Sequence, residues 1–229
     1  MKTIGLIGGM SWESTTTYYQ IINQTIKREL GGLHSAKCIL YSVDFAEIEQ
    51  CQVNGKWDKS AEILSAAARN LEMAGADFVV ICTNTMHKVV PQIQNHINIP
   101  ILHIADATAE TLIQQNIKTV ALLGTKYTMT QDFYKERLTS KGLSVMIPSE
   151  EEVETVNSII YNELCMGITS DSSRKVYSGI IERLKDTGAE AVILGCTEIG
   201  LLVGKKDSAL PVFDTTIIHA QKAAMQAIQ

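Results

Sequence analysis

Two apolar runs of the sequence are each followed by small polar or thiol-bearing residues. Cys82–Thr85 ends the first run, and Gly195–Glu198 follows the second. The thiolate form of Cys196 would be an effective base, whereas the hydroxyl of Thr83 is a far weaker one unless something activates it. The hydroxyl, amide and backbone N–H groups beside them can bind a carboxylate. The two segments therefore predict proton transfer on a small anionic molecule.

An internal repeat places the two segments at matching positions. Continuing the second of three repeat matches without a gap sets Thr83 opposite Cys196. The order of the matches favours two similar lobes, and chance agreement between apolar strands is the alternative. The matches, at offsets of 116, 113 and 111 residues, are Lys2–Gly8 with Lys118–Gly124, Gly75–Ile81 with Gly188–Leu194, and Ile99–Ile101 with Leu210–Val212.

Two related lobes around one ligand predict chemistry from both sides of a carbon atom. A base on one face can remove a proton while a group on the other face returns one, which is the stereochemistry of racemisation. Asn84, Thr85 and Thr197 would add neutral donors for a substrate carboxylate. A helix start should lower the pKa of Cys196 from its usual value of about 8.5, so we expect a thiolate base there.

The elements that must position these residues alternate between short apolar runs and segments of helical period. This alternation predicts a doubly wound α/β fold with buried, mainly parallel strands, and ligands bind beyond the carboxyl ends of such strands. The expected strands are Thr3–Ile7, Cys38–Val43, Phe78–Cys82, Ile101–His103, Thr119–Leu123, Leu143–Ile147, Ala191–Leu194 and Val212–Phe213. The expected helices are Ser14–Leu30, Trp57–Ala74, Asp106–Asn116, Thr130–Ser140, Val153–Met166 and Ser173–Thr187.

The repeat divides these elements into two pseudosymmetric lobes with the active site expected between them. The N-terminal lobe, on the Thr83 side, is predicted to comprise residues 1–103 and 208–229, and the C-terminal lobe, on the Cys196 side, residues 104–207. Capping-box spacings and glycines mark the ends of the predicted helices. The spacings are Asp44 with Glu47 and Ser149 with Glu152, and the glycines are Gly31, Gly75, Gly142, Gly167 and Gly188.

The composition excludes several classes of protein. The chain has 229 residues, 45% of them hydrophobic, with Lys+Arg 20 against Asp+Glu 25 and a formal net charge of −5. This mildly acidic net charge does not favour binding to nucleic acid or to an anionic membrane surface. No apolar run reaches the ~20 residues that a membrane span needs. Five cysteines without CxxC or Cys/His spacing predict neither a disulfide framework nor a metal site, and we expect a cytoplasmic protein.

The sequence gives only weak support for a bound nucleotide or pyridoxal cofactor. The glycine turn Gly5–Gly9 lacks GxGxxG spacing and a P-loop lysine, which disfavours a nucleotide. A pyridoxal enzyme needs a Schiff-base lysine, and only Lys126 lies near the predicted site. We therefore expect no cofactor.

Four motifs together resemble those of the aspartate/glutamate racemase family, and most closely its L-aspartate/glutamate-specific racemases. The resemblance covers nearly the whole chain. It implies a cofactor-independent, two-base racemase acting on an acidic amino acid, built from two pseudosymmetric α/β domains and usually a homodimer. The motifs are IGLIGGM at 4–10, CTNTMH at 82–87, LLGTKYTMTQDFY at 122–134 and GCTE at 195–198.

Two departures from the family pattern matter. Members with two catalytic thiols carry a cysteine where this chain has Thr83. Cys82 stands one residue too early, and because strand side chains alternate in direction it should point into the core. The resemblance implies that Cys196 handles the L enantiomer and Thr83 the opposite face. Family members that favour aspartate bring basic side chains to the distal carboxylate. The matching stretches of this chain, Glu49–Gln52 and Glu163–Gly167, contain no Lys or Arg.

The remaining substrate contacts are therefore expected to be neutral or carried by the backbone. Gln52 and the backbone near Gly167 are expected at the distal carboxylate, and Met10 is expected to offer its backbone N–H. Glu198 is expected to orient Cys196 or the substrate ammonium, although a surface carboxylate is the alternative. A neutral site gives weak affinity and tolerates more than one side-chain length. His87 could polarise the site or be structural.

Two other functions stay open at this point. A single-thiol decarboxylase of the same superfamily would protonate a planar enolate from Cys196 alone. A degenerate binding protein would hold an acidic amino acid without turning it over. Retention of Asn84 and Thr85 favours the racemase, and loss of the second thiol is what keeps the binder possible.

Overall fold

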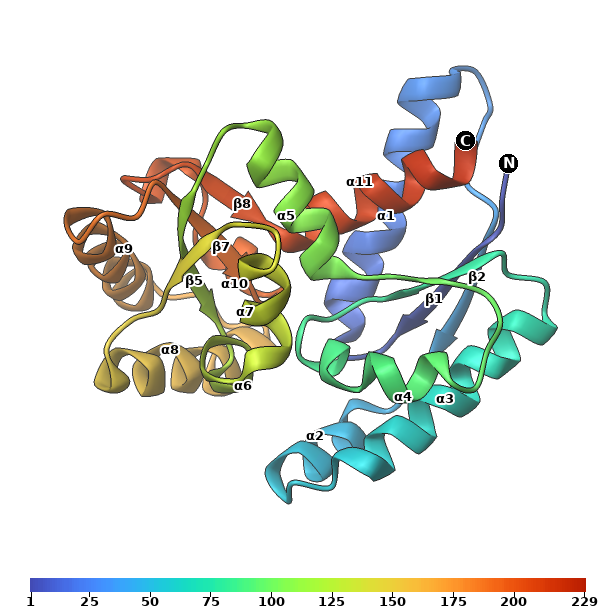
Figure 1. The fold of residues 1–229 in the computed structure, drawn as a ribbon, viewed down its shortest axis with the longest axis horizontal. Coiled ribbons are helices and arrows are strands. Elements are labelled where there is room, and N and C mark those ends of the chain that lie inside the picture. Colours follow the sequence, from blue (N-terminus) through green and yellow to red (C-terminus); the bar gives the residue numbers. More distant parts are fainter. The chain divides into compact units, whose positions relative to one another are not determined.

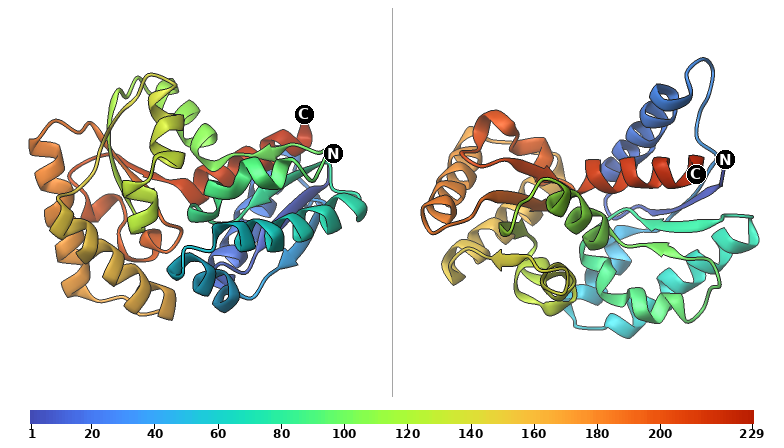
Figure 2. Two further views of the ribbon diagram at one scale, coloured as in Figure 1. Left: turned by 60° about the horizontal axis from the view of Figure 1, so that its bottom comes forward. Right: turned by 45° about the horizontal axis from the view of Figure 1, so that its top comes forward.

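The computed structural model describes residues 1–229, which form two compact units (Figures 1 and 2). Unit 1 comprises Met1–Ile104 and His219–Gln229, and unit 2 comprises Ala105–Ile218. The sequence predicts that the chain returns to the first lobe at residue 208, but in the structure it returns later. The strand Val212–Asp214 pairs with Ala191–Gly195 inside unit 2, so the chain returns only within its last helix. No helix has both the length and the apolar character that a membrane span requires.

Unit 1 contains a four-stranded parallel sheet in the order β2-β1-β3-β4. Its strands are β1 (Ile4–Gly8), β2 (Cys38–Ser42), β3 (Phe78–Ile81) and β4 (Ile101–Leu102). Its helices are α1 (Trp12–Leu30), α2 (Phe45–Val53), α3 (Trp57–Met73), the 3-10 turn η1 (Thr85–Val89) and α4 (Val90–Gln94), and the end of α11 (Thr215–Ile228) completes the unit.

Unit 2 contains a second four-stranded parallel sheet, in the order β6-β5-β7-β8. Its strands are β5 (Thr119–Gly124), β6 (Ser144–Met146), β7 (Ala191–Gly195) and β8 (Val212–Asp214). Its helices are α5 (Ile104–Gln114), α6 (Lys126–Thr130), α7 (Asp132–Thr139), α8 (Glu150–Asn162), α9 (Asp171–Asp186) and α10 (Ile199–Leu202), with the 3-10 turns η2 (Leu164–Met166) and η3 (Lys205–Asp207). The predicted α/β class with parallel sheets is confirmed.

The two sheets share strand order and register, as the repeat predicts. Ile7 of β1 pairs with Ile81 of β3, and in the second sheet Leu123 of β5 pairs with Leu194 of β7. These four residues match one another in the repeat, so each unit has the same pairing at the same step. Thr83 is the second residue after Ile81, and Cys196 is the second after Leu194. The two side chains therefore occupy equivalent positions in their own units.

Side-chain alternation along the strands divides the core of unit 1 into two layers. Ile4 and Leu6 of β1 pack with Tyr18 and Ile22 of α1 and with Ala220 and Ala224 of α11. Residues of opposite parity pack with α3 and α4 on the other face, which Figure 1 shows below the sheet. Both faces of each central strand are thus covered, which is why these strands read as unbroken apolar runs. The core members of that second face include Ile7, Val79, Ile81, Leu64, Ala68, Leu71 and Ile93.

Local signals account for several helix ends. Ser149 and Glu152 form the predicted capping box, with both reciprocal hydrogen bonds present. The side chain of Asp44 accepts from the Ala46 N–H and begins α2. The expected helix 130–140 is instead α6 and α7, because Gln131 adopts extended backbone. The glycines predicted to end helices all have positive φ, a conformation open to glycine at little cost: Gly31, Gly75, Gly142, Gly167 and Gly188.

Gly9, in the turn after β1, is where a side chain should cost most. Its φ is +94°, and an added Cβ would lie 2.1 Å from the Val43 carbonyl oxygen. Gly31 also has positive φ, but nothing lies within 4 Å of an added Cβ. Gly9→Ala should lower the free energy of unfolding by roughly 3 kcal/mol or more, and Gly31→Ala by about 1 kcal/mol. Urea unfolding of both variants tests this, and equal losses would contradict the steric argument.

Candidate active site

Cys196, Thr197 and Glu198 form a buried hydrogen-bonded group at the carboxyl end of β7. Their exposed fractions are 7%, 8% and 4%. The Cys196 thiol donates to Oε2 of Glu198 at 3.0 Å, and the Thr197 hydroxyl donates to the same oxygen at 2.8 Å. Glu198 is therefore not a surface carboxylate. Its oxygen is directed at the thiol and is in place to accept the thiol's proton.

The surroundings of Cys196 shift its pKa in the direction opposite to the expected lowering. Burial raises its pKa well above the usual range, and the negative charge of Glu198 raises it further. The helix that was expected to lower the pKa is only four residues long and begins at Ile199, beyond Cys196. Desolvation outweighs so short a dipole, so the thiol needs a base before it can abstract a proton.

A second acidic group lies near Glu198 in unit 2. Asp214, at the end of β8, accepts from the Thr216 N–H at 2.8 Å and packs so closely on Gly200 that a Cβ there would lie 2.3 Å from its carboxylate oxygen. Burial raises the pKa of Asp214, and the charge of Glu198 contributes a smaller increase. Of these two carboxylates, Glu198 is the one whose negative charge raises the pKa of Cys196.

Thr83 lies in unit 1, in a loop whose successive carbonyls are each hydrogen-bonded. The Ser14 hydroxyl donates to the Cys82 carbonyl at 3.4 Å, Nδ1 of His87 donates to the Thr83 carbonyl at 2.8 Å, and the His87 N–H donates to the Asn84 carbonyl at 3.0 Å. Thr83 is half-buried, whereas Asn84 and Thr85 are buried. The backbone of this loop is thereby fixed.

Cys82 is a core residue, as its place in the strand predicts. Its side chain is fully buried among the α1 and α11 contacts of the unit 1 core. Burial raises the pKa of this thiol above the usual range. Cys82 therefore has no role as a base, and Thr83 is the residue at the position equivalent to Cys196.

The other residues expected to contact substrate fall into two groups. In unit 1, Met10 and Met86 share one core layer, and the Gln52 side-chain amide donates to the Met86 sulfur at 3.1 Å. In unit 2, Gly167 is exposed in the left-handed conformation, and its N–H donates to the Leu164 carbonyl. Gln52 and Gly167 are thus engaged within their own units, and their contacts with substrate stay predictions.

Three buried histidines gather at the carboxyl ends of β3 and β4, a feature that spacing along the chain does not reveal. The His87 ring lies 4.5 Å from that of His103 and 5.7 Å from that of His219. Tyr18 of α1 donates its hydroxyl to Nδ1 of His219, and Nε2 of His219 donates to the Leu102 carbonyl, both at 2.9 Å. The cluster joins residues more than 100 positions apart, and only the apolar period of α11 around His219 hinted at its burial.

Acid should destabilise the protein through His219. Burial lowers the pKa of this histidine from 6.5 to about 4, so the unfolded chain binds a proton more readily than the folded one. The contribution of His219 to the free energy of unfolding is fully present above pH 6.5. It decreases by roughly 3 kcal/mol in total as the pH falls toward 4. Urea unfolding of wild type and His219→Gln between pH 7 and pH 4 tests this. The variant should be less stable at pH 7 with a shallower pH dependence, and identical pH slopes would contradict the assignment.

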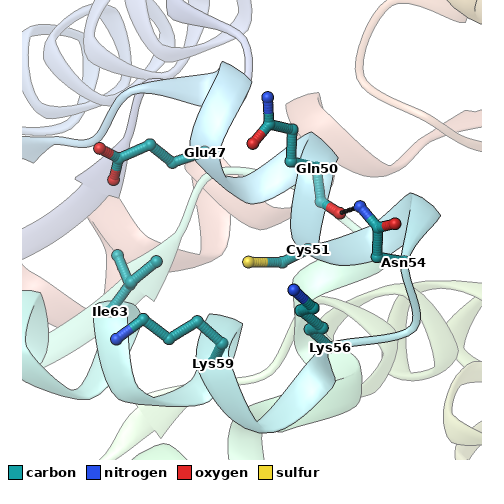
Figure 3. Close-up of a pocket in the computed structure, with 7 residues that line it drawn as sticks. All are labelled: Glu47, Gln50, Cys51, Asn54, Lys56, Lys59 and Ile63. Carbon is teal, nitrogen blue, oxygen red and sulfur yellow. Dashed lines mark hydrogen bonds between the residues drawn. The ribbon is translucent and has the colours of Figure 1, made fainter.

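Unit 1 also has an open cavity of about 420 Å³ between α2 and α3 (Figure 3). The Cys51 sulfur points into it, and the Lys56 and Lys59 side chains lie along its edge (Figure 3). None of the residues expected to contact substrate lines this cavity.

Lys126, the lysine that the sequence places near the predicted site, is half-exposed in unit 2 and forms an ion pair with Glu154. This environment does not fit a buried Schiff-base lysine.

Comparisons with known proteins agree with the motifs. The family model described as Asp/Glu/Hydantoin racemase matches residues 7–223. The chain is 22% identical over 231 residues to the broad specificity amino-acid racemase RacX of Bacillus subtilis (strain 168), covering 95% of each chain.

Solved structures give the same result. The crystal structure of a candidate Asp/Glu racemase from Yersinia pestis is 56% identical with a TM-score of 0.93, and that of an aspartate racemase homologue from Pyrococcus horikoshii OT3 is 38% identical with a TM-score of 0.85. Both alignments cover 100% of each chain. The chain therefore belongs to the Asp/Glu/hydantoin racemase family and is an isomerase of the racemase type.

Proposed function

We propose that the protein racemises L-aspartate, L-glutamate or both without a cofactor, with Cys196 and Thr83 transferring the α-proton. The observation that carries this proposal is the buried hydrogen bond from the Cys196 thiol to the Glu198 carboxylate. A thiol paired with a carboxylate can be converted into a base at the moment a substrate needs one. The racemase family, and the relatives named for aspartate and glutamate, support this substrate class.

The Cys196 half of the reaction starts with a proton passing from the thiol to Glu198. The resulting thiolate takes the α-proton of the L-substrate, which restores the thiol and leaves a planar carbanion conjugated with the carboxylate. A substrate ammonium would favour the thiolate by placing positive charge beside it. Glu198 is thus proposed as a proton acceptor as well as an orienting group.

The Thr83 half of the reaction is proposed to complete the inversion. The Thr83 hydroxyl gives its proton to the face of the carbanion opposite that used by Cys196. Solvent must later return a proton to the Thr83 oxygen and take one from Glu198, which restores the starting protonation of both residues. The support for this role is the equivalence of Thr83 and Cys196 in strand register. Because a hydroxyl is a weak acid and a weak base, this half limits the rate.

Substrate recognition is proposed to use neutral groups. Asn84, Thr85 and Thr197 would donate to the α-carboxylate together with the Met10 backbone N–H. Gln52 and the backbone near Gly167 would serve the distal carboxylate. Without a charge-assisted pair at that end, the site should accept both four-carbon and five-carbon acids with weak affinity.

We further propose that the protein is cytoplasmic and works as a homodimer. All five cysteines are free thiols, as is usual in a reducing compartment. The dimer rests on the family resemblance, and sedimentation velocity at micromolar concentration tests it: a monomer at every concentration would contradict it.

Replacing the carboxylate tests the proton acceptor directly. Glu198→Gln keeps the side-chain size and a hydrogen-bond acceptor but cannot take the thiol proton. We expect kcat for both enantiomers to fall by roughly 10²-fold or more, with KM changing much less. Chiral chromatography of L- and D-aspartate and glutamate measures both constants. Full activity in Glu198→Gln would contradict the proposed role, and no racemisation of any of the four substrates by wild type would contradict the proposed function.

A further inference from the structure

We propose that His87 is a positioning residue for Thr83, so that its loss slows the Thr83 half of racemisation more than the Cys196 half. This inference rests on the proposed function. It starts from the buried histidine cluster of unit 1, which proton transfer at Cys196 does not use. Among the three histidines, His87 is the one hydrogen-bonded to the residue proposed to protonate the carbanion.

Both ring nitrogens of His87 are engaged with backbone groups. A carbonyl can only accept, so the 2.8 Å contact with the Thr83 carbonyl places the proton on Nδ1. Nε2 then accepts from the Ile104 N–H at 3.2 Å. With Nδ1 donating and Nε2 accepting, the ring is held in one tautomer, and it is only 1% exposed. A ring used in this way holds backbone in place instead of polarising a substrate.

His87 links the loop after β3 to the end of unit 1. Ile104 is the last residue of unit 1 before the chain passes into unit 2. The His87 backbone N–H also donates to the Asn84 carbonyl at 3.0 Å, so this one residue fixes two consecutive carbonyls of the loop. The His103 ring packs edge-on against the His87 ring and restrains it from the side. The backbone of Thr83 is thus held by a buried, rigid side chain.

Position matters more for Thr83 than for Cys196. A weak acid such as a hydroxyl transfers its proton efficiently only when it is well aligned, and a displacement of about 1 Å can cost roughly 10²-fold in rate. The Cys196 side chain is held by other groups, namely Glu198 and the unit 2 core. Loss of His87 should therefore separate the two halves of the reaction.

Two substitutions distinguish the ends of the ring. In His87→Asn the side-chain amide can take the place of Nδ1 and donate to the Thr83 carbonyl. In His87→Gln the longer amide can take the place of Nε2 and accept from Ile104, while the Thr83 bond is lost. Racemisation should fall by roughly 10²-fold in His87→Gln and clearly less in His87→Asn. Deuterium exchange into L-substrate should stay within about threefold of wild type in both variants.

His219→Gln is the matched control. His219 is equally buried and belongs to the same cluster, but its ring bonds are to Tyr18 and Leu102, not to Thr83. We expect it to lower thermal stability and to change exchange and racemisation by the same factor. Equal losses of exchange and racemisation in the two His87 variants would overturn this inference alone. No exchange by wild type would overturn the proposed function and this inference with it.

Discussion

Cys196→Ser should nearly abolish exchange of the α-proton of L-aspartate and L-glutamate with solvent. The serine hydroxyl has almost the size of the thiol, but it cannot become a base of comparable strength beside Glu198. We expect exchange and racemisation both to fall by roughly 10³-fold or more. Proton NMR in D2O measures the exchange as loss of the α-proton signal.

Cys38→Ser is the control for loss of a thiol. Cys38 is half-buried on β2 of unit 1, and no proposed step uses it. Its substitution should leave exchange unchanged. Since Cys196 belongs to the core of unit 2, thermal unfolding must show that Cys196→Ser is folded under the assay conditions. A folded Cys196→Ser with wild-type exchange would contradict the assignment of the base.

Thr83→Cys should accelerate racemisation in both directions by the same factor. A thiol transfers a proton far more readily than a hydroxyl, and general acid–base groups contribute roughly 10²-fold or more. Because two enantiomers have equal free energy, a true racemase has equal kcat/KM from either side. A faster step on the Thr83 face must therefore raise both values together. Initial rates from L- and D-substrate, followed by chiral chromatography, measure this.

Thr85→Cys is the matched control for the added thiol. Thr85 lies two residues further along the same loop, and its side chain is buried. A thiol there does not occupy the position equivalent to Cys196, and the change also removes a proposed donor to the α-carboxylate, so racemisation should be slower than in wild type and not faster. An unchanged or slower rate in a folded Thr83→Cys would contradict the placement of the second proton donor at Thr83.

Much of the fold could be predicted from the sequence because parallel strands buried on both faces leave a strong apolar signal. All eight expected strands are present, and the repeat appears as one strand order used twice. The end of the first lobe was predicted within one residue. The return of the chain to this lobe was predicted too early, because the pairing of β8 with β7 is a long-range contact that local sequence composition does not reveal.

The candidate site was only partly predictable. Position in a strand was sufficient to place Cys82 in the core and to place Thr83 and Cys196 at equivalent steps of their own units. The predicted direction of the Cys196 pKa shift was wrong, since burial and the direction of the Glu198 side chain depend on tertiary packing. The histidine cluster was missed because His219 reaches His87 from the far end of the chain.

The most direct test is to incubate the wild-type enzyme with L-aspartate or L-glutamate in D2O. Proton NMR would follow the α-proton, and chiral chromatography would follow the D-product. If Cys196 with Glu198 removes the proton readily and Thr83 limits its return to the other face, deuterium should enter the L-substrate faster than D-product accumulates. No exchange into either L-substrate would contradict the account.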